Sequence, residues 1–376
     1  MSRSADLAGT LVECIDDQRR SGLHLGAQVY VSRHGKPLVD AAVGESVPGR
    51  PLRDDDLMCW YSSGKPLTTA AVLGCWERGL LGLDDPVGRY VEGWGAGKER
   101  ATVRHVLTHT GGFTMLGRNE PFDADLPYGE VVARIAAHPA EWEPGTAAGY
   151  HPSTGWKVLG AIVEAVDGRP IDRYLAEEVT GPAGTATSRL GIGRADQEVL
   201  GDRIVPVHWT GHALPLRTSD GGVRMVEYHI ERIHNEAWHV AKVEPGGGFR
   251  GPAADLGRFY ESLLGHGPPV LDPRTVELMG AVHRYGVVDA VFGTKTPWGL
   301  GVQVAGGMTG RVGRRAFGHN GMASSRGMAD PDLGLVVAYV TNGLTDPIRN
   351  EQRMSAVVNL VYDALGEEAE RVRRPG

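Results

Sequence analysis

The chain lacks any run of about 18 apolar residues, and residues 1–17 show no cationic start followed by an apolar stretch and a cleavage site. The first absence excludes a membrane-spanning helix, so no membrane is expected as a partner. The second gives no indication of an export signal. We therefore expect a cytoplasmic protein.

Excess positive charge and paired cysteines are also missing. The 46 acidic residues outnumber the 39 Lys and Arg residues, which gives a net charge of −7 and predicts no binding of nucleic acid. The three cysteines, Cys14, Cys59 and Cys75, are isolated and show no CxxC spacing. Three separate cysteines inside apolar stretches predict reduced thiols packed as small hydrophobic groups.

The chain is long and rich in glycine. Its 376 residues, 41% hydrophobic and 23% charged, can bury the core of one large domain or of two lobes. The 54 glycines are scattered among apolar stretches, which indicates many tight turns and not disorder. Because no repeat or low-complexity segment interrupts residues 1–376, we predict a single domain.

A serine and a lysine three residues apart open an apolar segment. The sequence YSSGK occupies 61–65, and an apolar stretch follows to residue 73. Positions i and i+3 share one face of a helix, so the hydroxyl of Ser62 can meet the amine of Lys65. A buried lysine with a lowered pKa can take the proton of a serine, which predicts Ser62 as a nucleophile and Lys65 as its activator. The alternative is ordinary solvated helix surface, because this spacing also occurs by chance.

Strand patterns lie at both ends of the chain, and helix patterns lie between them. Two strands are expected within 26–44, and others follow near the far end, at 300–304, 316–318, 326–330 and 334–342. Turns between these strands are typical of hairpins, which predicts an antiparallel sheet. Amphipathic helices are expected at both ends, at about 5–20 and 349–365.

These patterns predict an α+β fold with two lobes. An antiparallel sheet with N- and C-terminal helices would form one lobe from 1–60 and 290–376. A mainly helical lobe would occupy 61–289 and include an irregular wall or lid at 183–245. We expect this stretch, rich in His and Trp within 205–240, to give aromatic contacts to a ligand or to be plain connecting structure.

Two further segments could supply partners for the serine. Tyr150 follows a Pro-Gly-Thr turn at 144–146 and precedes an expected helix, so its phenol could enter a cleft. A phenol near a lysine ammonium has a lowered pKa and can shuttle a proton, although an ordinary packed tyrosine is the alternative. In GHNGM at 318–322, Gly321 would let a substrate approach the backbone, and the next N–H could point at an oxyanion.

His105 and His109 stand at i and i+4 of a short expected helix, a spacing that can bind a metal. No acidic residue or cysteine is spaced to complete such a site. The histidines of 183–245 also fit no known metal spacing. We therefore expect structural histidines and neither a metal nor another cofactor.

Four segments together resemble the serine β-lactamase and penicillin-binding-protein superfamily. They are SSGK at 62–65, LTHTGG at 107–112, PGT at 144–146 with YH at 150–151, and GHNG at 318–321. Their order and spacing resemble the class C β-lactamase-like branch, which includes family VIII carboxylesterases and related acyltransferases. The resemblance covers about residues 10–365 and implies a β-lactamase/transpeptidase-like fold.

The resemblance implies roles for the reacting groups. Ser62 would form the acyl-enzyme, Lys65 would hold and activate it, and Tyr150 would act as general base and then as acid. A shifted alignment would instead bring His151 to the tyrosine position, but the spacing from the Pro-Gly-Thr turn favours Tyr150.

The third motif would bind the substrate. The N–H groups of Ser62 and Met322 would form the oxyanion hole, and Asn320 and Gly321 would lie beside the substrate. His319 would be the fourth catalytic residue and would stand where the family's Lys-Thr-Gly motif has its lysine.

Two departures from the β-lactamase pattern favour an esterase. Pro152 replaces the asparagine of the family's Tyr-x-Asn motif, and a proline side chain neither donates nor accepts hydrogen bonds. His319 replaces a lysine whose fixed charge suits the carboxylate of β-lactams or peptides, and a neutral imidazole suits such a carboxylate less well.

We therefore predict a serine hydrolase that acts through an acyl-enzyme on a small-molecule ester or amide. The alternative is an acyltransferase that passes the acyl group to an amine or alcohol, because the same residues serve both half-reactions. A β-lactamase or D,D-peptidase, and a binding protein without catalysis, are the remaining alternatives.

Overall fold

A seven-stranded antiparallel sheet organises the computed structural model, which describes residues 3–115, 125–211, 214–217, 223–226, 230–308 and 310–373. The strands follow the order β10-β11-β12-β13-β1-β2-β3 across the sheet. Their bounds are β1 Gly26–Arg33, β2 Lys36–Val47, β3 Arg50–Pro51, β10 Gln303–Val304, β11 Phe317–Gly321, β12 Ser325–Asp330 and β13 Leu335–Thr341. The sheet is thus built from both ends of the sequence.

Strand β1 joins the two ends because it pairs with β2 on one side and with β13 on the other. Its side chains alternate between the two faces of the sheet. Val29 and Val31 belong to the core formed with α1 (Arg3–Arg20) and α12 (Pro347–Leu365), whereas Tyr30 belongs to the core on the side of α10 (Ala253–Leu263). Helices therefore cover both faces, and apolar residues fill both faces of β1.

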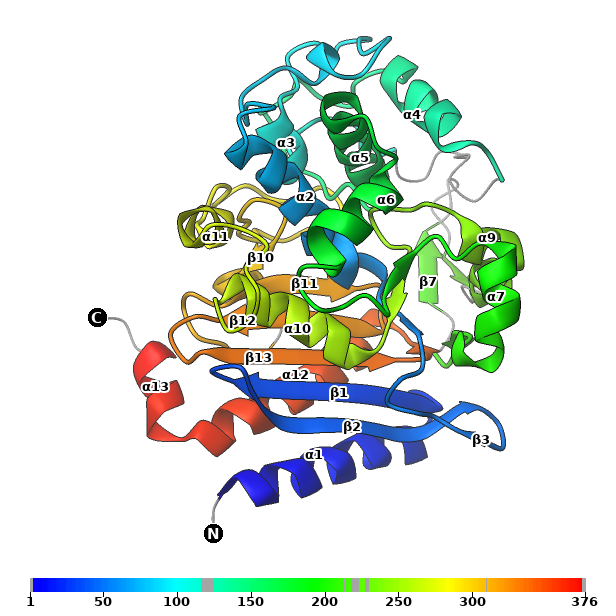
Figure 1. Ribbon diagram of the computed structural model, residues 1–376, viewed down its shortest axis with the longest axis vertical. Coiled ribbons are helices and arrows are strands. Elements are labelled where there is room, and N and C mark those ends of the chain that lie inside the picture. The colour runs from blue at the N-terminus through cyan, green and yellow to red at the C-terminus, as the bar shows by residue number, and fades with distance from the viewer. Residues whose placement is uncertain are drawn as a thin grey trace.

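The middle of the chain forms a mainly helical part, which lies at the other end of the molecule from α1 (Figure 1). Its helices are α2 Lys65–Glu77, α3 Val103–Leu107, α4 Tyr128–Ala137, α5 Thr154–Asp167, α6 Ile171–Leu175 and α11 Pro273–Gly280. Helix α2 is largely buried and packs against α5 inside this part. The predicted α+β fold with an antiparallel sheet and terminal helices is confirmed, and the division into lobes stays a prediction.

The stretch 183–245 contains only short elements where it is described. They are β5 Arg189–Leu190, α7 Arg194–Leu200, β6 His208–Trp209, β7 Leu214–Arg217, β8 Val223–Val226, α8 Glu231–His234 and α9 Ala237–Ala241. Strand β5 joins β9 (Phe249–Gly251) and β4 (Met58–Cys59) in a three-stranded sheet, and β6 pairs with β14 (Gly343–Leu344). Positions 212–213, 218–222 and 227–229 of the predicted wall lie outside the described residues.

Three element boundaries differ from the expected ones. A 3₁₀ turn, Tyr61–Gly64, contains Ser62, and the α-helix begins only at Lys65. The strand expected at 300–304 is reduced to β10, because Gly299 and Gly301 form tight turns before it. Helix α13 (Glu367–Arg373) continues the chain after α12.

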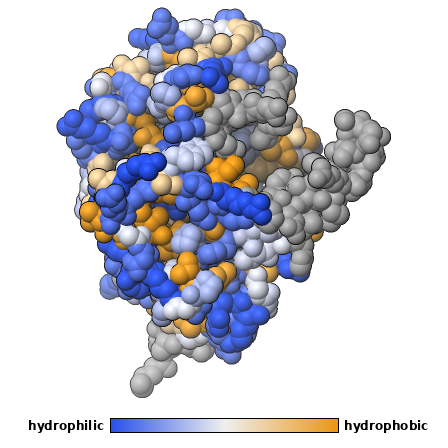
Figure 2. Space-filling model, turned by 90° about the vertical axis from the view of Figure 1, so that its right-hand side faces the viewer, coloured by the Kyte–Doolittle hydropathy of each residue, from blue (hydrophilic) through white to orange (hydrophobic). Residues whose placement is uncertain are grey.

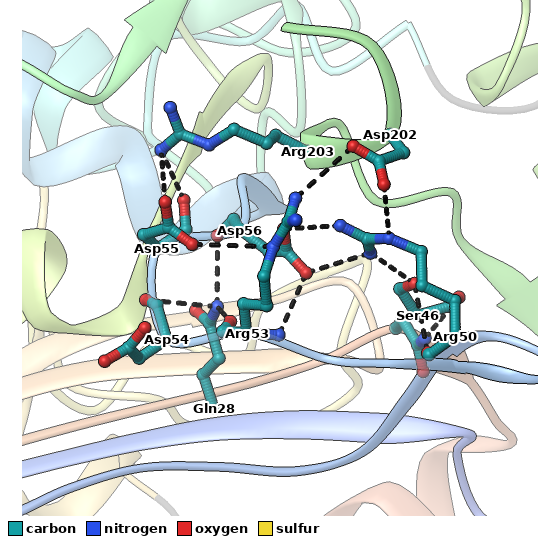
Figure 3. Close-up of polar contacts among 10 residues, drawn as sticks. Gln28, Ser46, Arg50, Arg53, Asp54, Asp55, Asp56, Asp202 and Arg203 are labelled. Carbon is teal, nitrogen blue, oxygen red and sulfur yellow. Dashed lines mark hydrogen bonds and ion pairs between the residues drawn. The ribbon is translucent and has the colours of Figure 1, made fainter.

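A network of charged side chains holds the approach to β4 (Figure 3). The carboxylate of Asp56 is fully buried and accepts hydrogen bonds from Arg50 and Arg53, and both arginines also contact Asp202. The N–H of Leu57 donates to the carbonyl of residue 203 at 2.7 Å. Removing one partner of a buried ion pair lowers the stability of the fold by about 3–5 kcal/mol. The network therefore stabilises the conformation of the residues that precede Ser62.

No helix in the described part of the chain is long and apolar enough to cross a membrane. The face of the molecule on the right of Figure 1 is mainly hydrophilic and carries hydrophobic patches near its middle (Figure 2). Single exposed hydrophobic groups are normal on a protein surface and carry no functional argument by themselves.

Candidate active site

The turn that carries Ser62 is held in one conformation by its neighbours. Tyr61 has a φ of +46°, a left-handed conformation that costs about 1 kcal/mol or more for a residue with a side chain. Its phenol oxygen lies 2.9 Å from Nδ1 of His234, a contact that holds the ring. At Gly64 a Cβ atom would lie 2.8 Å from the ring of Phe249, so no larger residue fits there. The strained turn directs the Ser62 hydroxyl away from the core of α2.

Ser62, Lys65 and Tyr150 meet at one oxygen atom. Lys65 Nζ lies 3.0 Å from Ser62 Oγ, and Tyr150 Oη donates to the same oxygen at 2.8 Å. In a 3₁₀ turn the side chains at i and i+3 are eclipsed, which explains why a serine just before α2 still faces the lysine at its start. The structure thus brings three predicted residues together, while their roles stay a prediction.

The amine of Lys65 is fully buried. It donates to the backbone carbonyls of Pro152 at 2.6 Å and of Gly246 at 2.5 Å, and it lies 4.9 Å from the ring centre of Trp156. Within the described residues no carboxylate forms an ion pair with it. Burial therefore lowers the pKa of Lys65 well below its usual range. The proline that replaces the expected asparagine does contact the lysine, but through its backbone.

Tyr150 is fixed by an acid and by aromatic rings. Its N–H donates to Oδ1 of Asp289 at 3.1 Å, and its ring packs on Phe292, Trp298 and His109 with centroid distances of 4.9, 5.9 and 4.7 Å. Burial raises the pKa of Tyr150, and the charge of Asp289 adds to this. The expected fall in this pKa is therefore wrong, because removal from water outweighs the hydrogen bond to Ser62, which lowers it. The phenol stays protonated at neutral pH and acts as a donor.

The histidines near this cluster are structural. Nε2 of His151 accepts from the N–H of Phe113 at 3.3 Å, so the phenol of the preceding residue, not this imidazole, reaches Ser62. His105 closes a capping box at the start of α3, and His109 lies buried among rings, where burial lowers its pKa well below the usual range. No group of three or more His, Cys, Asp or Glu side chains is arranged to hold a metal ion in the described part of the chain.

Strand β11 lies against the turn of Ser62 and carries His319. Ser63 Oγ donates to the carbonyl of His319 at 3.0 Å, which ties the turn to the strand. The imidazole is buried, and burial together with the nearby Lys65 lowers the pKa of His319 to about 3. The ring is therefore neutral. Asn320 Oδ1 accepts a hydrogen bond from Nε of Arg326 at 2.8 Å, so this oxygen is engaged within the sheet.

Gly321 and Met322 end this strand beside Ser62. A Cβ atom at Gly321 would lie 2.0 Å from Ser325 Oγ and 2.3 Å from the carbonyl of Trp60. The glycine thus allows the nucleophile turn to approach β11, and the predicted approach of a substrate to this backbone stays a prediction. Met322 is 45% exposed and lines a pocket with Ser62. Its predicted place in an oxyanion hole stays a prediction.

A buried ion pair joins the two segments whose carbonyls hold Lys65. Glu244 forms an ion pair with the fully buried Lys157, and its Oε2 also accepts from Ser153 Oγ at 2.9 Å. Its other oxygen accepts from the N–H of Gly246 at 3.2 Å. One carboxylate therefore connects the start of α5, just after Pro152, to the glycine turn at 246.

The serine turn, the tyrosine segment and strand β11 form one cluster. The sequence that contains them was compared with known proteins. The family model described as Beta-lactamase matches residues 11–358. The chain belongs to the beta-lactamase family. The resemblance stated from the four sequence motifs is thereby confirmed.

Other members of the beta-lactamase family show the range of relatives. The chain is 29% identical to Esterase EstB of Burkholderia gladioli over 385 residues, covering 92% of this chain and 94% of that protein. It is 27% identical to monacolin J acid methylbutanoyltransferase of Aspergillus terreus over 253 residues, covering 61% and 58%. A crystal structure of a family VIII carboxylesterase superposes with a TM-score of 0.78 at 22% identity, covering 93% and 97%, which shows a shared fold.

The sequence did not indicate several residues that position the catalytic candidates in this member of the beta-lactamase family. Asp289 binds the backbone of Tyr150 and is fully buried, and Gly246 supplies a carbonyl to Lys65. A lone acid within the apolar sequence VVDAV at 287–291 and three successive glycines at 246–248 are the signals that could have indicated them. The indole of Trp156, which donates to the carbonyl of Lys65 at 3.0 Å, gave no such signal.

Proposed function

We propose that this protein is a serine esterase that forms a covalent acyl-enzyme at Ser62 with small-molecule esters. One observation carries the proposal: the hydroxyl oxygen of Ser62 lies within 3.0 Å of both the Lys65 amine and the Tyr150 phenol. Burial moves the pKa values of these two groups in opposite directions, downward for the amine and upward for the phenol. Opposed pKa shifts around one nucleophile assign a base and an acid.

In the proposed first step the neutral amine of Lys65 takes the proton of Ser62. Two of its hydrogens donate to the carbonyls of Pro152 and Gly246, which leaves the lone pair toward Ser62 Oγ. The oxygen attacks the ester carbonyl carbon, and the N–H groups of Ser62 and Met322 stabilise the resulting oxyanion. This assignment gives Lys65 the role of first base, which the family resemblance gave to Tyr150.

In the second step the tetrahedral intermediate collapses and the bond between the acyl carbon and the alcohol oxygen breaks. The phenol of Tyr150 gives its proton to the departing oxygen and regains one from the Lys65 ammonium, because Ser62 Oγ is now acylated and carries no proton. Water then attacks the acyl-enzyme, releases the carboxylic acid and returns the proton to Ser62 Oγ. Each group ends in its starting protonation state.

An ester is favoured over a β-lactam or a peptide carboxylate as the substrate. The neutral, buried imidazole of His319 stands where a fixed positive charge would bind a carboxylate. The relative named Esterase EstB supports the same choice. Acyl transfer to an amine or alcohol is the second candidate, and the relative named a methylbutanoyltransferase supports it. In either case the partner is a small-molecule acyl donor.

Mass spectrometry after incubation with p-nitrophenyl acetate or a fluorophosphonate tests the proposal. We expect one adduct on Ser62, its loss in Ser62→Ala and its retention in the neighbouring variant Ser63→Ala. No adduct with any acyl group would overturn the proposal and favour a binding protein without catalysis. Product analysis with added amines separates the two candidates, because an amide that outcompetes the free acid identifies an acyltransferase.

A further inference from the structure

A pocket of about 160 Å³ opens beside Ser62, and the function proposed above does not explain its walls. Its lining includes Tyr61, His234 and His239 on one side and Gly247 and Met322 near Ser62. The histidines belong to the stretch 205–240, whose role the sequence did not determine.

This pocket lies on the acyl side of the nucleophile. Ser62 lines it, whereas Tyr150 and Phe292, which pack against each other, are not among its described lining residues. In the proposed reaction the alcohol leaves toward the phenol that protonates it. The acyl group attached to Ser62 must then extend to the side without the phenol, which is the side of this pocket.

Flat rings form one wall of the pocket. His234 and His239 stack with ring centroids 4.3 Å apart and an interplanar angle of 22°. Tyr61 packs against His234 at 5.5 Å and also holds it by a hydrogen bond from the phenol. Nη2 of Arg250 donates to the carbonyl of His234 at 3.0 Å, which fixes the backbone of this wall. Burial lowers the pKa of His239 to about 3, so the imidazole is neutral.

The size of the pocket fits one ring. A cavity of about 150 Å³ holds one benzene molecule in a well-studied engineered case. At about 160 Å³, this pocket is close in size to that cavity and accommodates a six-membered ring. Gly247 leaves the space in front of the Ser62 amide open, since a Cβ atom there would lie 4.0 Å from the amide nitrogen.

We propose that the acyl group transferred to Ser62 is a single-ring aromatic acid, stacked on the ring pair of His234 and His239. This inference rests on the proposed esterase function and names its substrate class. A bond forms between Ser62 Oγ and the aromatic acyl carbon, the ester C–O bond breaks, and the alcohol leaves with the proton from Tyr150. Hydrolysis then releases a benzoic-type acid.

The test compares two p-nitrophenyl esters with the same leaving group. Benzoate carries a flat ring, whereas cyclohexanecarboxylate carries a ring with the same number of carbons that is not flat. An aromatic pair is worth a factor of about two to ten beyond its buried area. We expect His239→Leu to reduce the ratio of kcat/KM for benzoate to that for cyclohexanecarboxylate by about fivefold. The matched control His266→Leu, beside His34 in the sheet part, should leave the ratio unchanged.

A second measurement needs no variant. The unaltered protein should cleave p-nitrophenyl 1-naphthoate at least about tenfold more slowly than the benzoate, because the volume of the pocket is close to that filled by one ring. An unchanged ester ratio in His239→Leu, or equal rates with one and two rings, would overturn the inference. Adduct formation on Ser62 with p-nitrophenyl acetate separates failure of this inference from failure of the esterase proposal. If the adduct forms, only the assignment of an aromatic acyl group is wrong. If no ester gives an adduct, the esterase proposal is wrong as well.

Discussion

Two groups of side chains meet at Ser62, and the fold holds them differently. The reactive cluster consists of Ser62, Lys65 and Tyr150, and it rests on α2, α5 and the sheet through fully buried contacts. The pocket wall consists of Tyr61, His234 and His239. Its histidines belong to α8 and α9, which have four and five residues.

Helices this short are not stable alone, so side-chain contacts such as that between Tyr61 and His234 hold the wall in place. The difference shows that proton transfer and the choice of acyl group depend on separate structural elements. The proton-transfer groups lie at or just before the starts of the long packed helices α2 and α5, and the histidines of the surface that would select the acyl group lie on short helices. Changes in the cluster should therefore abolish chemistry, whereas changes in the wall should alter preference.

The largest effect is expected for Lys65→Ala, which removes the proposed base. The rate of acyl-enzyme formation should fall by about a thousandfold or more, in the range of general acid–base contributions. Stopped-flow release of p-nitrophenolate measures this rate. The matched variant Lys98→Ala removes another buried lysine, which donates to backbone carbonyls and lies over the ring of Trp94 outside the site. Equal losses of rate per folded molecule in both variants would contradict the assignment.

Tyr150→Phe keeps the ring and removes the proton donor. We expect turnover to fall by about 100-fold, with an unchanged thermal unfolding profile apart from the lost hydrogen bond. Tyr128→Phe is the control, because its buried phenol donates to the carbonyl of Lys157 at 2.6 Å, away from Ser62. Near-normal turnover in Tyr150→Phe would move the proton transfer to another group.

The pH dependence of kcat/KM should show one acid limb and no alkaline limb near neutrality. Below the lowered pKa of Lys65 the amine is protonated and cannot act as a base, so the rate should fall about tenfold per pH unit. Because the pKa of Tyr150 is raised, the phenol keeps its proton well into the alkaline range. Initial rates across the pH range provide the check, and a decline that begins just above pH 7 would refute the assignment.

Glu244→Gln should have the smallest effect on rate and a clear effect on stability. The change leaves the buried ammonium of Lys157 without its ion-pair partner, which costs about 3 kcal/mol in comparable cases. The turn at Gly246 also loses its anchor, so turnover should fall by a few fold. Denaturant unfolding of Glu244→Gln and of the double variant Lys157→Met/Glu244→Gln measures the coupling. A double variant less stable than the single one would contradict a paired role.

The sequence predicted the main elements because their patterns are local. Alternating apolar residues in β1 and the apolar helix after Lys65 indicate their structures without tertiary information. The motifs also indicated which residues gather at Ser62. The contacts of Asp289 and Gly246 could not be predicted, because they depend on backbone atoms and on turns far away in sequence.

The pKa values of buried groups also could not be predicted from the sequence. The pKa of Tyr150 was expected to fall near an ammonium, but this depends on how much water surrounds the phenol, and that follows only from packing. Likewise the sequence 205–240 showed many rings without indicating that His234 and His239 stack against each other. Their spacing of five residues matches no helical face, since α8 and α9 are separate helices.

The pairing of β1 with β13 has a consequence for biosynthesis. Ala27 pairs with Thr341, so the ribosome must deliver the distant strand β13 before the sheet can close. Contacts this distant in sequence slow folding and leave strand edges open in the meantime. The serine turn is translated early, but the strand that supports it, β11, emerges late. A nascent chain that still lacks β11 would therefore carry this serine without its supporting strand, so covalent labelling should begin only after β11 has emerged.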